Sequence, residues 1–254
     1  MSYLMLLGTG TCQIELERRA SSVLLNLAGL PILFDCGRGI CQRLLEVGLH
    51  PNALEHIVIS HFHPDHVSDL IPLMHAGAWS RRQPRKQDLH LYGPPGLQRL
   101  VDGLMRLFSP HSFRQPHYQI LVHEIAEETF QVGPYRFDFI ELPPAGNHGL
   151  RFTWQGQRYA VTGDSSFHEQ ERLFLQGCDL AVIDSGHLSD DEIVQLAAAT
   201  QVRTLVCSHL YRELDAARLQ EQARAEGYRG SLLVGRDLMT FVLPDEEGCE
   251  PAGE

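Results

Sequence analysis

Three histidines and one aspartate lie within a single six-residue segment, residues 61–66 (HFHPDH). Because alternate residues of an extended chain point to the same side, His61 and His63 can bind one metal ion together. The proline that follows cannot continue a strand, so we expect Asp65 and His66 to face a neighbouring position that suits a second metal ion. A solvent-exposed histidine-rich turn is the alternative. We disfavour it because four residues of metal-ligand type follow a hydrophobic strand.

The residues on either side of this motif indicate how it is positioned. The apolar run at residues 56–60 (HIVIS) predicts a short buried strand, and residues 67–82 predict the beginning of a helix. The motif therefore occupies a strand-to-helix loop, which is where α/β sheets place their ligands.

The rest of the chain predicts two strand-rich halves with helices outside them. Ser189 and Glu192 form a capping box at the start of one helix. Two such halves imply two packed sheets covered on both faces, a four-layer αββα sandwich of the α/β class. Further strands are expected at residues 3–7, 23–27, 32–35, 89–92, 119–123, 129–132, 135–142, 150–154, 159–162, 180–183, 204–207 and 239–242, and further helices at residues 40–47 and 215–226.

The motif HxHxDH is typical of the metallo-β-lactamase superfamily, and the chain resembles this family over nearly its whole length. Within the superfamily, the LGTG turn and residues 186–210 are most similar to the ribonuclease Z branch and its phosphodiesterase relatives. The resemblance implies one αββα domain across residues 1–254, with a frayed tail at residues 245–254. The similar segments are residues 6–11 (LLGTGT), 24–37 (LLNLAGLPILFDCG), 161–166 (VTGDSS) and 205–210 (LVCSHL).

A two-metal site follows from this resemblance. It implies that His61, His63 and His148 bind the first divalent ion, that Asp65, His66 and His209 bind the second, and that Asp164 bridges them. Imidazole and carboxylate ligands suit Zn²⁺ but do not exclude Mn²⁺, Fe or Ni. Without the rest of the pattern, a lone histidine such as His148 before a strand would be a surface-loop residue.

Asp35, in the turn FDCG, has two possible roles. Its carboxylate either forms a hydrogen bond with a ligand imidazole, which fixes the tautomer of that histidine, or simply ends a strand.

The expected chemistry is hydrolysis. Two cations about 3.5 to 4 Å apart can share one water, lower its pKa and provide a bridging hydroxide as the nucleophile. Asp65 would orient this hydroxide or take its proton. His187, in DSGH, matches the position of the catalytic histidine in the ribonuclease Z branch and would protonate the leaving group. Its alternative role is a hydrogen bond within the turn.

The interval between two expected ligands bears on the substrate. Ribonuclease Z carries a long arm for transfer RNA between these positions, whereas here His148 and Asp164 are 16 residues apart, enough for one hairpin. The net charge of −11 gives no general attraction to polyanions. Both features favour a small phosphodiester, such as a cyclic nucleotide, over nucleic acid. The alternatives are a ribonuclease Z-like endoribonuclease, a lactonase or thioesterase, and a non-catalytic metal-binding accessory protein.

Composition sets the remaining expectations. The six scattered cysteines without a CxxC pair, and an N-terminus without a basic leader, predict a cytoplasmic protein, and no apolar run approaches a membrane span. The basic residues 81–86 (RRQPRK) are the one candidate for a basic patch that could bind nucleic acid, but we expect them to form a solvated linker between a helix and a strand. Residues 109–118 (SPHSFRQPHY) either cap the substrate or form an ordinary surface loop. Relatives of this kind are often homodimers, so a homodimer is one possibility.

Overall fold

The strands form two seven-stranded sheets, as a computed structural model of residues 1–113 and 117–244 shows. The first sheet has the order β14 (Thr240–Val242), β1 (Tyr3–Gly8), β2 (Ser22–Leu27), β3 (Leu30–Phe34), β4 (His56–Val58), β5 (Leu89–Gly93) and β6 (Ile120–Glu124). The second has the order β13 (Ser231–Val234), β12 (Thr204–Ser208), β11 (Leu180–Asp184), β10 (Gln157–Val161), β9 (Asn147–Trp154), β8 (Tyr135–Leu142) and β7 (Thr129–Val132).

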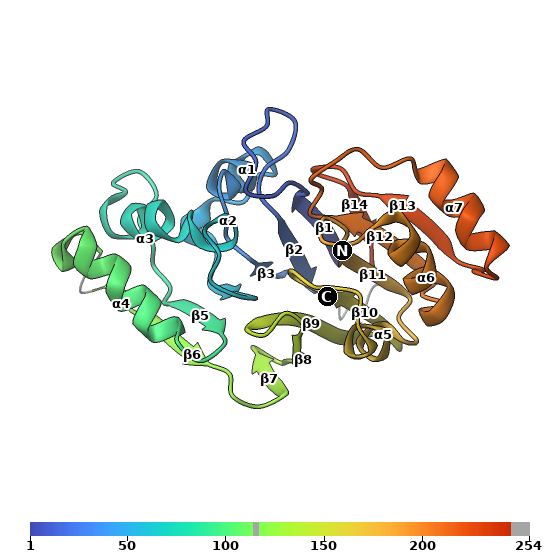
Figure 1. Cartoon of the computed structure of the whole chain (residues 1–254). Coiled ribbons are helices and arrows are strands. Elements are labelled where there is room, and N and C mark those ends of the chain that lie inside the picture. The colour runs from blue at the N-terminus through green and yellow to red at the C-terminus, as the bar shows by residue number, and fades with distance from the viewer. Residues whose placement is uncertain (114–116, 245–254) are drawn as a thin grey trace, which may run out of the picture.

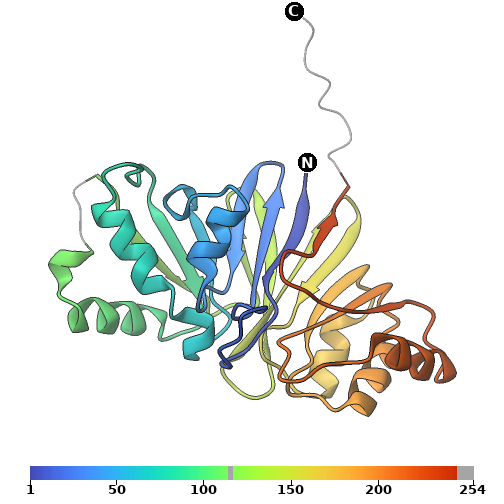
Figure 2. The ribbon, with the colours of Figure 1, turned by 90° about the horizontal axis from the view of Figure 1, so that it is seen from above.

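Helices cover the outer faces of both sheets (Figures 1 and 2). On one side lie α1 (Ile40–Glu46), α2 (Pro64–Val67), α3 (Leu70–Trp79) and α4 (Leu97–Leu107), and on the other α5 (Glu169–Leu175), α6 (Asp190–Thr200) and α7 (Ala216–Ala225). Short 3₁₀ turns occur at Pro51–Ala53 and Pro110–Ser112.

Three apolar layers hold these elements together. Phe34 and Phe137 belong to the layer between the sheets. Leu33 packs in the layer that includes the helices of the first sheet, and Ile183 and Ile193 pack in the layer of the second. Because each sheet is apolar on both faces, it has to be covered on both. The predicted four-layer αββα sandwich is therefore confirmed (Figure 2).

Parallel strands bring distant segments to one edge of the molecule. Strands β3, β4, β5 and β6 run parallel to one another, and so do β10, β11, β12 and β13. In such sheets, ligands bind beyond the carboxyl ends of the strands. The loops after β3, β4, β10 and β12, together with the last residue of β11, therefore supply the side chains described below.

Helix α3 begins later than the sequence predicted. The predicted helix from residue 67 is interrupted, because α2 ends at Val67 and α3 starts at Leu70. Between them, Asp69 donates its backbone N–H to the carbonyl of Cys36 and accepts a hydrogen bond from the backbone N–H of Cys41. These tertiary contacts stabilise the interruption between α2 and α3.

Strand β9 begins earlier than predicted, at Asn147 rather than Leu150, so His148 lies within the strand. The prediction also omitted α4, α5 and β13. The capping box of Ser189 and Glu192 at α6 is confirmed.

The structure also bears on the predictions for the basic segment at residues 81–86, the cysteines and membrane-spanning helices. The basic residues do connect α3 to β5, but the segment is not solvated throughout, because Arg85 is fully buried and donates hydrogen bonds to the carbonyls of Leu54 and Pro51. The described cysteines, at positions 12, 36, 41, 178 and 207, are all free thiols, whereas Cys249 and the predicted frayed tail lie outside the described residues, as do residues 114–116 of the loop at 109–118. None of the helices in residues 1–113 and 117–244 combines the length and hydrophobicity that crossing a bilayer requires.

Candidate metal centre

Asp164 lies between two pairs of imidazoles. Its Oδ1 is 3.0 Å from Nε2 of His66 and 3.3 Å from Nε2 of His209. Its Oδ2 is 3.4 Å from Nε2 of His61 and 3.6 Å from Nδ1 of His63. One carboxylate oxygen facing each pair is the arrangement that a carboxylate bridging two cations requires.

Asp65 adds a second carboxylate to one of these pairs. Its Oδ2 lies 3.5 Å from Nε2 of His209 and 3.9 Å from Nε2 of His66. Among the described residues, potential ligand atoms form three groups, each within 4.8 Å. Two are fully buried, Asp65 with His66 and His209, and His61 with His66 and Asp164. The third contains Asp164, Asp184 and His209 together with the exposed His187.

Several of these buried atoms have no hydrogen-bond partner among the described residues, namely Nε2 of His61 and His66, both ring nitrogens of His209, and Oδ1 of Asp164. Buried polar atoms normally have a partner. Imidazole nitrogens and a carboxylate oxygen that converge in this way suit divalent cations. The buried clusters are therefore consistent with a dinuclear metal site.

Asp35 orients His66. It follows β3 in a left-handed conformation (φ 64°), and its Oδ2 lies 2.7 Å from Nδ1 of His66. The same carboxylate accepts hydrogen bonds from the backbone N–H and the hydroxyl of Ser60, at 2.8 and 2.7 Å. When Nδ1 of His66 donates to Asp35, Nε2 is left with its lone pair toward Asp164. The first of the two roles considered for Asp35 is thus the one observed.

Asp184 places its carboxylate beside the Nδ1 atoms of two other histidines, as Asp35 does beside that of His66. The sequence did not predict this role. This buried carboxylate at the end of β11 lies 3.3 Å from Nδ1 of His209 through Oδ1 and 2.6 Å from Nδ1 of His187 through Oδ2. It also accepts hydrogen bonds from the backbone N–H groups of Ser165 and Gly186. The sequence does contain a signal for this role, because Asp184 is an acidic residue at the end of the fully buried strand β11 (LAVID).

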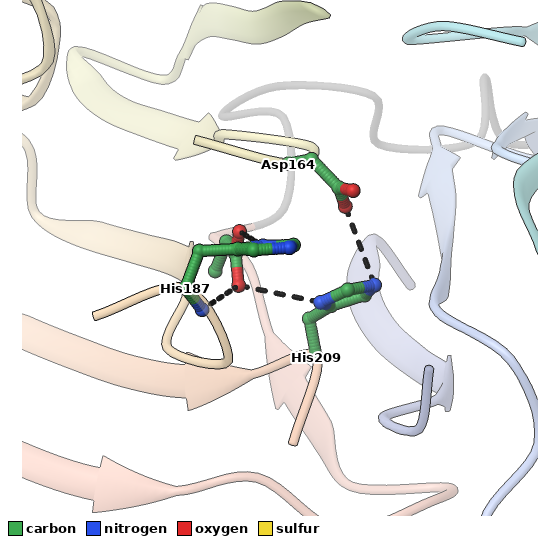
Figure 3. Close-up of side chains that lie close together, drawn as sticks. Asp164, His187 and His209 are labelled. Carbon is green, nitrogen blue, oxygen red and sulfur yellow. Dashed lines mark hydrogen bonds and ion pairs between the residues drawn. The ribbon is translucent and has the colours of Figure 1, made fainter. Parts of the chain in front are cut away.

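His187 lies at the rim of the cluster, with 44% of its side chain exposed. Its ring is 5.4 Å from that of His209, and Figure 3 shows both rings near Asp164. Because Asp184 holds Nδ1, the orientation of the imidazole is fixed.

The protein groups alone shift the pKa values strongly. Burial lowers the pKa of His209, but the nearby carboxylates of Asp184 and Asp65 outweigh this and raise it to about 9. Burial lowers the pKa of His61. The hydrogen bond with Asp184 raises the pKa of His187. A bound cation would compete with the protons on ligand imidazoles, because metal ligands have to be deprotonated.

The predicted ligands of the HFHPDH motif lie close to Asp164 or His209. The ring of His148 stacks on Phe139 at 4.5 Å and 14°, and its buried Nδ1 has no hydrogen-bond partner among the described residues. Burial lowers the pKa of His148, and the nearby His61 adds to this effect. Its role as a ligand stays a prediction. His63 faces Asp164 but has 65% of its side chain exposed.

The sequence and the fold both have known relatives. Residues 31–219 match the family described as "Beta-lactamase superfamily domain". The chain therefore belongs to the metallo-β-lactamase superfamily. A curated relative, ribonuclease Z of Thermococcus onnurineus (strain NA1), is 34% identical over 265 aligned positions, covering 80% of this chain and 83% of that protein.

Two solved structures share the fold at low sequence identity. The metallo-beta-lactamase fold protein YhfI from Bacillus subtilis superposes with a TM-score of 0.78 at 19% identity, covering 94% of this chain and 98% of that one. A diphosphatase from the PhnP family superposes with a TM-score of 0.70 at 17% identity, covering 96% and 98%.

Proposed function

We propose that this hydrolase is a metal-dependent phosphodiesterase acting on a small phosphodiester such as a cyclic nucleotide. The observation that carries the proposal is the bridging position of Asp164 between two imidazole pairs, beside His187. Divalent ions bound there, with Zn²⁺ as our choice, would lower the pKa of a water and stabilise the attacking and leaving oxygens of an in-line displacement.

The remaining steps belong to the protein's own groups. Asp184 favours the protonated form of His187, because a carboxylate 2.6 Å from Nδ1 stabilises the imidazolium. The outer nitrogen of this exposed ring can then donate a proton to a departing alkoxide. Asp65 lies beside His209 and is our candidate to orient the attacking water.

The hairpin before Asp164 is short, and this bears on the size of the substrate. Trp154 pairs with Gln157, so β9 and β10 are joined by a tight turn at Gln155 and Gly156, and no arm extends from it. The alignment with the Thermococcus protein contains 265 positions but covers only 80% of this chain, so the relative carries sequence with no counterpart here. Both points favour a small substrate.

A ribonuclease Z-like endoribonuclease is the second candidate, because the Thermococcus relative has that name at 34% identity. A basic surface would be needed to recruit RNA to a chain of net charge −11.

The test is a substrate panel with purified, metal-replete protein. It contains bis(p-nitrophenyl) phosphate, cyclic nucleotides, a precursor transfer RNA, a lactone and a thioester. We expect turnover of the small phosphodiesters, and a His187→Ala variant slower by about 10²–10⁴-fold. His75→Ala, at an exposed position on α3, is the matched control and should retain full activity.

Other outcomes would replace the proposal. Cleavage of the precursor transfer RNA without turnover of small phosphodiesters would establish the endoribonuclease. Hydrolysis of the lactone or thioester alone would establish a different hydrolase, and the absence of any turnover would favour a metal-binding accessory protein.

A further inference from the structure

We infer that Tyr211 is a substrate-binding residue, whose hydroxyl exchanges the thiol of Cys12 for an oxygen of the phosphate group that binds beside His187. The inference deepens the proposed function and rests on it for the identity of this group. Phosphate binding can be measured without turnover, so the two can be tested separately.

Tyr211 lies beside the two histidines at the rim of the centre. It comes two residues after His209, and its ring is 5.4 Å from that of His209 and 5.6 Å from that of His187, at interplanar angles of 81° and 74°. His187 is the group that we propose to protonate the departing alkoxide. A phosphate ester that reaches His187 therefore comes close to the side chain of Tyr211.

Gly186 allows Tyr211 to pack this closely. A Cβ atom on Gly186 would lie 2.6 Å from Cδ2 of Tyr211 and would also collide with the backbone carbonyl of His209. Carbon atoms in van der Waals contact lie about 3.5–4.0 Å apart, so a larger residue would displace the tyrosine ring or the strand end beside it. The packing thus positions the ring before a substrate binds, which reduces the entropic cost of binding.

The hydroxyl of Tyr211 has a weak partner in the structure. Among the described residues, it forms one hydrogen bond, with Sγ of Cys12 at 3.5 Å. Cys12 is exposed in the loop between β1 and β2. A thiol is a weak donor and a weak acceptor, whereas a charged phosphate oxygen accepts strongly. Since a phenol is protonated at neutral pH, this hydroxyl can donate to a bound phosphate.

The neighbouring guanidinium is already committed to other groups. Arg212 donates hydrogen bonds to the carbonyls of Ser185 and Leu188, at 3.3 and 2.9 Å, and to the carboxylate of Asp190 at 2.8 Å. These contacts hold the turn between β11 and α6. Tyr211 is therefore the better placed donor for a substrate in the segment that follows β12.

The test is the calorimetric titration of the zinc-loaded protein with inorganic phosphate, with bound zinc counted by elemental analysis in every variant. Tyr211→Phe keeps the ring and removes only the hydroxyl. We expect the Kd for phosphate to rise by at least about tenfold, as for the loss of a hydrogen bond with a charged group. Tyr3→Phe, at the start of β1, is the matched control and should leave the Kd unchanged. An unchanged Kd in Tyr211→Phe, or no phosphate binding by the unmodified protein, would overturn the inference.

A Cys12→Ala variant separates substrate binding from a structural role. If Tyr211 only anchored the loop between β1 and β2, removing the thiol would weaken phosphate binding as much as removing the hydroxyl does. We expect instead that Cys12→Ala binds phosphate at least as tightly as the unmodified protein, because the hydroxyl then has no thiol partner to give up. Equal losses in Cys12→Ala and Tyr211→Phe would overturn the inference.

Kinetics with bis(p-nitrophenyl) phosphate gives a second readout. A hydrogen bond made in both the ground state and the transition state contributes to KM, so Tyr211→Phe should raise KM by about tenfold and change kcat little. A lower kcat at unchanged KM would contradict this.

These readouts separate the inference from the proposed function. Phosphate binding that depends on the Tyr211 hydroxyl, without turnover of any phosphodiester, would refute the function and keep the inference. Turnover of phosphodiesters with the same KM in Tyr211→Phe and the unmodified protein would do the reverse.

Discussion

Asp184 shows how much one buried carboxylate can control in this centre, because it contacts both His209 and His187. Asp184→Asn keeps the shape but removes the charge that orients the two imidazoles. We expect a loss of about 10–100-fold in metal affinity or kcat. Zinc titration and steady-state kinetics measure both, and Asp191→Asn, exposed on α6, is the control. Unchanged values in Asp184→Asn would refute its orienting role.

Glu171 should make stability depend on pH. It is fully buried on α5 and accepts a hydrogen bond from the hydroxyl of Ser165 at 2.7 Å, and burial raises its pKa from 4.5 to about 8. Between these values the folded protein holds a proton that the unfolded chain has released. The free energy of unfolding should therefore fall as pH rises through this window, by at most about 1.4 kcal/mol per pH unit.

A Glu171→Gln variant tests this linkage, because glutamine keeps the acceptor for Ser165 and cannot ionise. Its stability relative to the unmodified protein should increase from pH 5 to pH 8 in denaturant titrations. A constant difference across this range would show that Glu171 is ionised in the folded protein at all these pH values.

Residues of the centre differ in how far the sequence could predict them. The spacing within the HFHPDH motif brought His61, His63, Asp65 and His66 together in the prediction, and the structure places them near one another. Asp184 and Glu171 escaped notice, because an acidic residue becomes an orienting or a protonated group only through the elements packed around it. His148 stays a predicted ligand: it lies within β9, and its buried Nδ1 has no hydrogen-bond partner among the described residues.

Among the elements, the end of β1 is fixed by a distant carboxylate. Asp237, after β13, accepts hydrogen bonds from the backbone N–H and hydroxyl of Thr9 at 2.9 and 2.8 Å, and from Arg43 of α1 at 2.8 Å. The carbonyl of Thr9 in turn accepts from Leu210, next to His209 in its left-handed conformation (φ 55°). Asp237 thus links three elements to the loop that carries a candidate ligand.

Asp237→Ala is accordingly expected to reduce the free energy of unfolding by about 3 kcal/mol, because it removes the buried carboxylate that pairs with Arg43 and leaves this largely buried guanidinium with only the more exposed Glu46. Denaturant unfolding measures this loss. Asp102→Ala, at an exposed position on α4, should change stability by less than about 0.5 kcal/mol. Equal effects of the two substitutions would show that Asp237 has no special role.

The order of strands and helices was largely predictable, since buried parallel strands are continuous apolar runs. Helix α4 could also have been found, because Leu97, Val101 and Met105 repeat every four residues on its buried face. The break between α2 and α3 could not, since the contacts of Asp69 with Cys36 and Cys41 join segments far apart in the sequence.

At the scale of the whole molecule, the residues of the candidate metal centre come from both sheets. His66 follows β4 of the first sheet, whereas Asp164 and His209 follow β10 and β12 of the second. Cations bound between them should stabilise the folded state by about 2.7 kcal/mol at a free concentration 100 times Kd. Chelation should therefore lower Tm by roughly 5–10 °C. Calorimetry with and without chelator tests this, and an unchanged Tm for protein that has demonstrably lost zinc would contradict it.

The net charge of −11 and the short β9–β10 turn both support the proposal that the whole molecule acts on small substrates. The most direct test is to titrate metal-free protein with Zn²⁺ while following hydrolysis of bis(p-nitrophenyl) phosphate. The account predicts no turnover without metal and activity that rises with bound zinc. Equal turnover by the metal-free protein, or no phosphodiester turnover by the zinc-loaded protein, would contradict it.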